Sequence, residues 1–236
     1  MRLDKYTASV SHLSRRDASG AIRRGRVAVN GAVVRSPDAA GDPDRDTVEI
    51  DGVPAVYAAN VYYMLNKPAG YISSTEGSRT VLALLGEDGA RRGLFPCGRL
   101  DADTEGLLLI TDDGPLAHLL LSPRRHVEKE YFFECSPALT DEGIKMIEEG
   151  AVLSDFTAKP AKIAPSPDRL SGTITVTEGK YHQVKRMLAR AGSEVTYLRR
   201  VRFGPLTLDP ALGPGGYRPL TRGETDALKR ASEKGN

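Results

Sequence analysis

A polar turn that runs directly into an apolar segment is the feature that most limits how this chain can fold. Residues 98–111 read GRLDADTEGLLLIT. The first half carries four charged residues, Arg99, Asp101, Asp103 and Glu105, and the second half contains the apolar run 107–110. A run of this length behind turn residues is typical of a buried strand. We therefore expect a rigid sheet with Asp101 at its mouth, where a carboxylate is well placed to react. The alternative is a solvated acidic turn without a chemical role.

Length and composition indicate an ordinary globular protein, and its cysteines indicate a reducing environment. Its 236 residues can bury a substantial core, as one large domain or as a small and a medium one. The two cysteines, Cys97 and Cys135, form no CxxC pair, so neither a disulfide framework nor a zinc site is expected. The N-terminal residues lack the apolar core of an export signal, and no stretch approaches a membrane span of roughly 18 residues. We expect a cytoplasmic location, no metal and no membrane contact.

Charge is distributed unevenly along the chain. The formal net charge is +2, but residues 1–36 carry eight Lys/Arg against two Asp and the remainder is about −4 by the same count. A basic segment on a mildly acidic body indicates a polyanionic partner. A solvated basic surface would have the same composition, so charge is supporting evidence only.

Residues 1–36 predict a compact helical unit that ends in a hairpin. Leu3, Tyr6, Val10 and Leu13 have helical spacing, and Ser14 is placed to begin a second helix. Asn30-Gly31 between valines is a strong hairpin signal. The second helix should bury Ala18 and Ile22 and expose its arginines.

The string RLDKYTASVSHLSRRDASGAIRRGRVAVNG in this segment resembles the S4 RNA-binding domain. In that family the basic helix face and the adjoining loop lie on RNA phosphates. The resemblance implies that role for Arg15, Arg16, Arg23, Arg24 and Arg26. A small helical domain with merely solvated arginines is the alternative.

The rest of the chain predicts a mixed α/β domain. We place an S4-like domain and its hinge at 1–58, with the hinge around 54–60, a larger domain at 59–232 and a tail at 233–236. Strand-like segments include VYYMLNK, GLLLIT, KEYFFEC and TITV, and expected helices cover 80–85, 115–121, 140–149, 182–191 and 221–232. Without strict βαβ alternation, the fold class is α+β, a small α/β domain followed by a mixed-sheet domain.

Four motifs in order resemble the pseudouridine synthases, specifically the RsuA-like branch that modifies ribosomal RNA. The segment 98–111 resembles the family signature, in which the Asp at the position of Asp101 is the catalytic nucleophile. NKPAGYISS at 66–74 resembles the first motif, and we expect Lys67 and Pro68 to brace the active-site loop without a catalytic role. EKEY at 128–131 resembles the segment that brings an aromatic residue, here Tyr131, beneath the target base. TEGKYHQVKRM at 177–187 resembles the final motif, whose basic residue is Lys185.

Each motif has an ordinary structural interpretation when it is considered alone. Tyr131 could be a strand aromatic, His182 a helix-start residue, and Lys185 and Arg186 exposed charges on an amphipathic helix. Their joint occurrence in family order favours the enzymatic interpretation. The resemblance implies a mixed-sheet catalytic domain with Asp101, Tyr131 and Lys185 in one cleft.

The implied reaction breaks the glycosidic bond of a uridine in RNA and rejoins the uracil through C5. It needs no cofactor, and the sequence has neither a Gly-rich phosphate loop nor a His/Cys ligand cluster. A carboxylate suits a glycosidic centre, as in retaining glycosidases. Sequence leaves open whether Asp101 attacks ribose C1′ or base C6 or assists elimination. We expect Lys185 to supply the cation that keeps Asp101 ionised.

RNA contacts are expected at Arg99 and on two groups of basic residues, of which the arginines of the S4-like segment are the first. The family resemblance assigns Arg99 to the space vacated by the flipped base, whose removal from its stack costs a few kcal/mol. A second basic group lies between 180 and 202 and includes Arg186, which we expect to contact substrate phosphates.

The sequence therefore predicts site-specific pseudouridine formation in 16S small-subunit rRNA by a monomer, with an assembling subunit as the expected substrate. The rival within the class is a synthase for 23S rRNA. From other classes, a non-catalytic ribosome-assembly factor and a nucleoside-cleaving hydrolase remain. The hydrolase would need a second carboxylate such as Asp103 or Glu105, which we expect instead to stabilise the turn.

Overall fold

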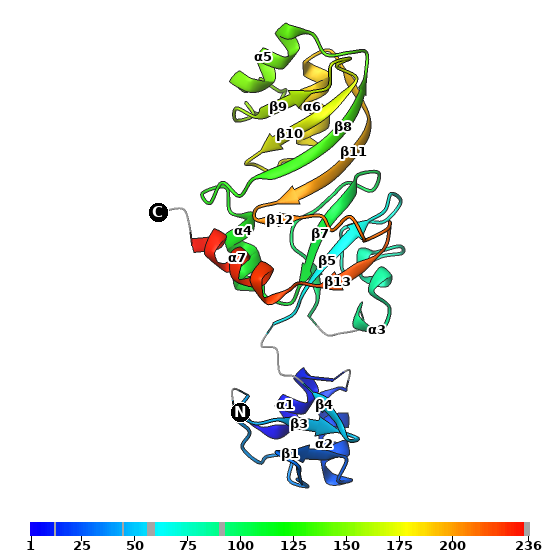
Figure 1. The fold of residues 1–236 in the computed structure, drawn as a ribbon, viewed down its shortest axis with the longest axis vertical. Coiled ribbons are helices and arrows are strands. Elements are labelled where there is room, and N and C mark those ends of the chain that lie inside the picture. Colours follow the sequence, from blue (N-terminus) through cyan, green and yellow to red (C-terminus); the bar gives the residue numbers. More distant parts are fainter. Residues whose placement is uncertain (12, 44, 56–59, 90–92, 234–236) are drawn as a thin grey trace. The chain divides into compact units, whose positions relative to one another are not determined.

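The computed structural model describes residues 1–11, 13–43, 45–55, 60–89 and 93–233, which form two compact units (Figure 1). The first is built from Met1–Val61 with the short segment that begins at Gly86, and the second from Tyr62–Leu85 and the chain from Gly93 onward. The expected hinge at 54–60 lies largely outside the described residues, as does the expected tail at 233–236. None of the helices in the described part is long and apolar enough to cross a membrane.

The first unit packs two helices on a four-stranded antiparallel sheet. The helices are α1 (Leu3–Ser9) and α2 (Arg15–Arg23), and the strands are β1 (Val27–Val29), β2 (Ala32–Val33), β3 (Val48–Ile50) and β4 (Val53–Ala55). The strand order is β2-β1-β3-β4. Leu3, Tyr6, Ile22, Val27 and Val48 form the buried core between the layers.

Two local signals in this unit, a helix cap and a hairpin turn, act as the sequence predicts. The Ser14 side chain accepts a hydrogen bond from the Asp17 amide and caps α2. Asn30 and Gly31 both have positive φ, at 52° and 80°, which is the conformation of a type I′ hairpin turn between β1 and β2. The helical spacing from Leu3 to Leu13 overestimates the first helix: α1 ends at Ser9, and Val10 and Leu13 reach the core from beyond it.

A nine-stranded mixed sheet dominates the second unit. Its main path runs β13-β5-β7-β11-β8-β10-β9 within the described residues, with β12 beside β11 and β6 beside β7. The strands are β5 (Tyr62–Lys67), β6 (Phe95–Pro96), β7 (Glu105–Thr111), β8 (Lys129–Ser136), β9 (Lys162–Pro165), β10 (Ser171–Val176), β11 (Glu194–Phe203), β12 (Leu206–Thr207) and β13 (Tyr217–Pro219). The predicted α+β class and the mixed sheet are confirmed.

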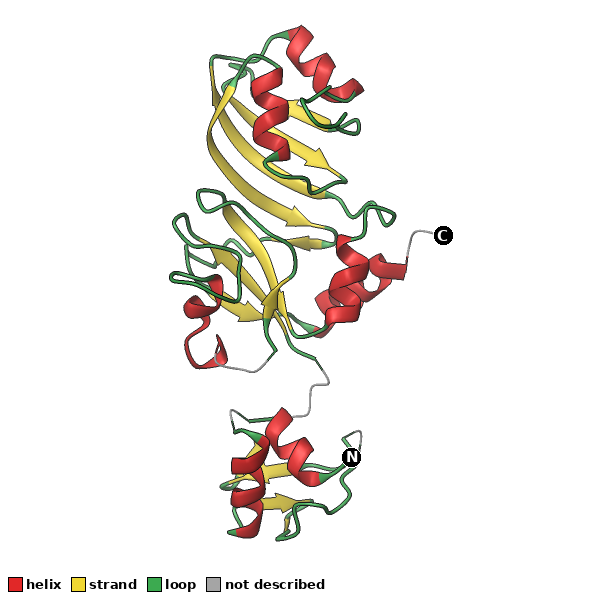
Figure 2. Cartoon of the chain, turned by 180° about the vertical axis from the view of Figure 1, so that it is seen from behind, coloured by secondary structure: helices red, strands yellow, loops and turns green. Residues whose placement is uncertain are grey.

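Helices lie over part of this sheet and beside it (Figure 2). They are α4 (Gly114–Leu121), α5 (Asp141–Glu149), α6 (Gln183–Arg190) and α7 (Arg222–Glu233), with the short α3 (Gly86–Gly89) directly after a 3-10 helix at Val81–Leu85. The helix predicted over 80–85 is therefore a 3-10 helix, and the other four predictions hold to within a residue or two. Figure 1 shows α4 and α7 side by side at one end of the sheet and α5 and α6 at the other.

The pairing of β7 with β11 determines where the site lies. These strands are parallel, with Arg199 beside Glu105 and Arg200 beside Gly106. The run 107–110 in β7 is fully buried, as the apolar pattern predicts. Gly106 has φ 99°, and any side chain at this position would collide with the Arg200 carbonyl, so close pairing here requires glycine. The turn before β7 therefore lies close to the segments that flank β11.

Candidate active site

The Asp101 turn is anchored by a buried lysine. Lys67, at the end of β5, is fully buried, and its Nζ donates to the carbonyls of Pro68 at 3.1 Å, Ala102 at 3.1 Å and Thr104 at 2.8 Å. Burial lowers the pKa of this ammonium from 10.5 to about 8. Two of the three carbonyls belong to the turn itself, so Lys67 braces the loop, as the Lys-Pro motif predicts.

A serine and two backbone contacts complete the anchoring. The Ser73 Oγ accepts from the Leu100 amide and donates to the Leu100 carbonyl, both at 3.0 Å. The Gly70 amide donates to the Ala102 carbonyl at 2.8 Å, and the Thr104 amide donates to the Asp101 carbonyl at 3.1 Å. A carboxylate on so constrained a backbone has little freedom to move away from a bound substrate.

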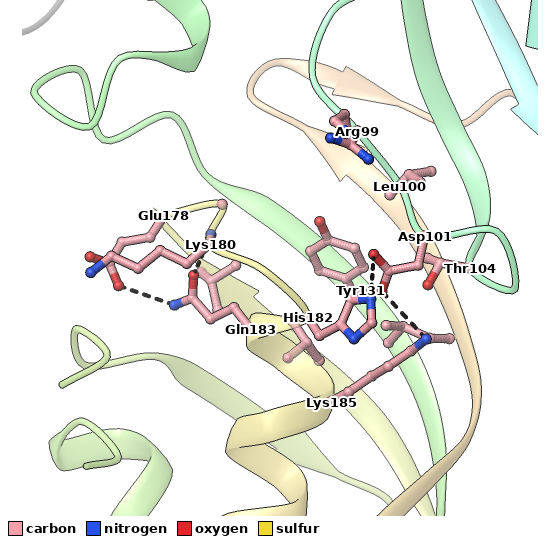
Figure 3. Close-up of a pocket in the computed structure, with 14 residues that line it drawn as sticks. Arg99, Leu100, Asp101, Thr104, Tyr131, Glu178, Lys180, His182, Gln183 and Lys185 are labelled. Atoms are coloured by element: carbon pink, nitrogen blue, oxygen red, sulfur yellow. Dashed lines mark hydrogen bonds and ion pairs between the residues drawn. The ribbon is translucent and has the colours of Figure 1, made fainter. Parts of the chain in front are cut away.

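Two cationic or titratable side chains contact the Asp101 carboxylate (Figure 3). The Lys185 Nζ lies 3.3 Å from Oδ2, and the His182 Nε2 lies 3.4 Å from Oδ1. The Asp101 side chain remains 29% exposed and therefore accessible to a substrate. The predicted pairing of Asp101 with Lys185 is present in the structure, whereas the His182 contact was not expected.

Asp103 is a second partner of the same lysine. Its Oδ1 accepts from the Lys185 Nζ at 2.6 Å, and this hydrogen bond holds the pKa of the Asp103 carboxyl below its usual range. The Asp103 side chain is 73% exposed. We expected Asp103 to stabilise the turn, but its side chain accepts a hydrogen bond from Lys185 of α6, so that Lys185 lies between the carboxylates of Asp101 and Asp103.

Tyr131 belongs to the same pocket. It lies in β8, cross-strand from Arg200 of β11, and is only 9% exposed. The pocket is lined by Asp101, Tyr131, His182 and Lys185, together with Arg99, Leu100, Thr104, Val176, Leu198 and residues 178–180, 183 and 184. Figure 3 shows the Tyr131 ring next to the Asp101 carboxylate. The three predicted catalytic residues therefore meet in one cleft although they come from three separate segments.

The start of α6 explains how His182 and Lys185 reach Asp101. His182 precedes the helix in the left-handed conformation, with φ 49° and ψ 32°, and this turns the chain sharply into α6. Non-glycine residues adopt this conformation uncommonly and at some cost in free energy. Lys185 then lies one turn into the helix. The HQV string was the sequence signal for this arrangement, although it does not reveal that the imidazole contacts Asp101.

The predicted RNA-contacting arginines occupy different environments. Arg99 lines the pocket. Arg186 instead forms an ion pair with Asp155, donates to the Ser154 Oγ at 3.1 Å and lies over the Phe156 ring. A guanidinium held in this way has fewer donors left for phosphate.

In the first unit, two of the five predicted arginines are ion-paired. Arg15 pairs with Asp4 at 3.3 Å and Arg26 with Asp51. The other three, Arg16, Arg23 and Arg24, are exposed and form no ion pair within the described part of the chain. The described residues also contain no group of three or more His, Cys, Asp or Glu side chains that could hold a metal ion.

Comparison with known proteins agrees with this geometry. The family profile described as RNA pseudouridylate synthase matches residues 61–190, and the S4 domain profile matches residues 1–39. The ribosomal small subunit pseudouridine synthase A of Escherichia coli (strain K12) is 44% identical over 233 residues, which cover 95% of this chain and 98% of the relative. The RNA pseudouridine synthase YtzG of Bacillus subtilis (strain 168) is 43% identical and covers 97% of this chain and 98% of its own. A pseudouridylate synthase crystal structure superposes with a TM-score of 0.68 at 36% identity and covers 97% of this chain and 99% of its own.

Proposed function

Because the chain belongs to the RNA pseudouridylate synthase family, we propose that it converts one uridine of 16S small-subunit rRNA into pseudouridine. The observation that carries this proposal is the ion pair of Asp101 with Lys185 in a cleft also lined by Tyr131. The choice of small-subunit RNA is supported by the 44% identity to the small subunit synthase of Escherichia coli over nearly the whole chain.

Asp101 acts as the nucleophile in this proposal. The C1′–N1 bond of the uridine breaks, the uracil turns, and a C1′–C5 bond forms while a proton leaves C5 and N1 gains one. A glycosidic carbon develops positive character as its bond lengthens, and an ionised carboxylate stabilises or captures that centre. The Lys185 Nζ, 3.3 Å from the Asp101 Oδ2, attracts the carboxylate, and this attraction strengthens after the base has displaced water from the cleft.

Tyr131 acts on the uracil base rather than on the ribose. Its ring is almost completely buried against the sheet, so its orientation is constrained before substrate arrives. A planar face in the pocket suits stacking against uracil. Its hydroxyl is the group that we assign to the C5 proton, which must leave for the isomerisation to finish.

RNA binding uses both units. The S4 unit contributes its exposed arginines to the phosphates, and Arg99 at the pocket holds the flipped nucleotide or fills the space it leaves. We assign Arg186 a smaller part in phosphate binding, because Asp155 already pairs with its guanidinium. The enzyme acts as a monomer in the cytoplasm, on an assembling small subunit.

Tritium release from uracil C5 tests the proposal directly. In vitro transcribed 16S and 23S rRNA, each free and partly assembled, are labelled with tritium at C5 and incubated with the wild type and Asp101→Asn. We expect release from one site in 16S rRNA, mapped by mass spectrometry, and none with Asp101→Asn. The matched control is Asp112→Asn, a change of the same type in the loop after β7.

The other outcomes separate the alternatives. Release only from 23S rRNA would retain the chemistry and refute the substrate. Salt-sensitive RNA binding without release from either RNA would indicate a non-catalytic assembly factor. Full release with Asp101→Asn would remove the proposed nucleophile.

A further inference from the structure

An exposed aromatic side chain stands immediately beside the cleft. Tyr181 is 75% exposed, the highest exposure among the exposed large hydrophobic side chains in the described part of the chain. Its ring stacks on the His182 imidazole with a centroid separation of 3.8 Å and an interplanar angle of 19°. His182 in turn contacts Asp101 at 3.4 Å. The tyrosine, the histidine and the carboxylate therefore form a continuous line from solvent to the proposed nucleophile.

A second groove, which Tyr181 helps to line, adjoins the catalytic pocket. The groove is lined by Tyr181 and Ile72 together with residues 73, 74, 99–102, 179, 180 and 182. Arg99, Asp101 and His182 line both the groove and the pocket, so the two form one surface. Ile72, which also lines the groove, is 38% exposed.

The groove also contains basic residues near its aromatic platform. Arg99 and Lys180 both line it, although the Lys180 Nζ lies 3.9 Å from the centroid of the Phe156 ring, which is not part of the groove lining. A flat aromatic face with cations at its edge is the combination that proteins use for single nucleotides, where the ring stacks on a base and the cations contact phosphate.

The His182 backbone and its stacked imidazole position this ring. The left-handed conformation of His182, with φ 49°, sets the direction of the chain just after Tyr181. One face of the tyrosine ring is covered by the imidazole, which leaves the opposite face for a ligand. A ring already stacked on one side loses little conformational entropy when a second flat group binds.

We propose that Tyr181 stacks on the nucleobase next to the target uridine in the RNA substrate. The inference rests on the proposed function, because a flipped uridine leaves its neighbour without a stacking partner at that position. The Tyr181 ring supplies the missing face a short distance from Asp101. Stacking of this kind is tolerant of base identity, so Tyr181 contributes affinity and register rather than sequence choice.

A double-mutant cycle across the protein–RNA interface tests this contact. The RNA is a short hairpin around the mapped uridine, intact or with an abasic site on its 5′ or its 3′ side. Dissociation constants are measured for wild type, Tyr181→Ala and Tyr181→Phe. Leu170→Ala is the control, since Leu170 is an exposed apolar residue at 44% in the loop before β10. We expect Tyr181→Ala to weaken binding by about 5- to 150-fold, the range for loss of one stacked base, and Tyr181→Phe to retain it.

The abasic RNAs identify the partner of the ring. At one flanking position, removal of the base should weaken binding to wild type and have almost no further effect on Tyr181→Ala. Independent, multiplicative effects at both positions would overturn the proposal, as would unchanged binding by Tyr181→Ala. Failure of the proposed function is visible separately, because wild type would then release no tritium. An active wild type with an equally active and equally tight Tyr181→Ala would overturn this inference alone.

Discussion

Replacing Lys67 by methionine tests how the Asp101 turn is held. Methionine has a similar length but no donors, so the carbonyls of Pro68, Ala102 and Thr104 lose their Nζ partner. Two of these carbonyls, those of Ala102 and Thr104, follow the proposed nucleophile in the same turn. We expect the free energy of unfolding and the turnover rate to fall together.

The expected change in the free energy of unfolding is the balance of two opposing effects. A buried polar group left without a partner costs about 1–3 kcal/mol, and three carbonyls are affected. The change also removes a buried charge, which a pKa of about 8 makes unfavourable by about 3 kcal/mol at pH 7. We therefore expect a net loss of about 3 kcal/mol in the free energy of unfolding at pH 7. A displacement of the turn by about 1 Å can lower turnover by about a hundredfold.

The effect should also depend on pH, with a definite sign. Lys67 has a pKa of about 8 in the folded chain and an ordinary pKa of 10.5 when unfolded. Between these values the unfolded state binds a proton that the folded state has released, so this lysine makes stability rise with pH. Below pH 8 both states are protonated and the cost of burial is present in full. From pH 7.5 to pH 10 the wild type should gain about 2 kcal/mol from Lys67, and Lys67→Met should not.

Urea unfolding at pH 7.5 and pH 10, with tritium release at pH 7.5, measures both effects. Lys129→Met is the matched control, because Lys129 is buried, has a pKa lowered to about 8, and donates from Nζ to the Val127 carbonyl. Both variants should lose part of the rise with pH, but only Lys67→Met should lose turnover. Equal turnover in the two variants, or an undiminished rise with pH in Lys67→Met, would refute the reasoning.

Three further perturbations separate the roles assigned to the site. Tyr131→Phe should bind RNA with unchanged affinity and lose turnover, measured by filter binding and tritium release; full activity would remove the hydroxyl from the mechanism. Lys185→Met should lower kcat by about 10²–10³-fold, the range for loss of one preorganised electrostatic group, whereas Asp103→Asn should retain most of the turnover. An unchanged kcat in Lys185→Met would disprove the role of the cation. Changing the exposed S4 arginines to alanine together should lower the slope of log K against log salt by up to about 3, one for each lost phosphate contact. A slope equal to that of wild type would count against these three residues, Arg16, Arg23 and Arg24.

The sequence by itself determined the local elements and the order of the motifs. The run 107–110 is a buried strand because its residues are uninterrupted and apolar, and α2 begins at Arg15 because the preceding Ser14 can cap it. The hairpin at Asn30 follows from the ease with which Asn and Gly adopt positive φ. Each of these signals acts within a few residues and can be recognised without the rest of the chain. Motif resemblance, rather than local physics, predicted Asp101, Tyr131 and Lys185 as one set.

Only the tertiary structure decided which side chains meet at the site. Parallel pairing of β7 with β11 brings the Asp101 turn to the start of α6, and the positive φ of His182 directs its imidazole to the carboxylate. The tertiary fold also pairs Arg186 with Asp155, and it brings the Lys67 ammonium to the carbonyls of the turn. These contacts join residues between 31 and 94 positions apart, so their energies depend on strand pairing and burial, which no local window of sequence contains.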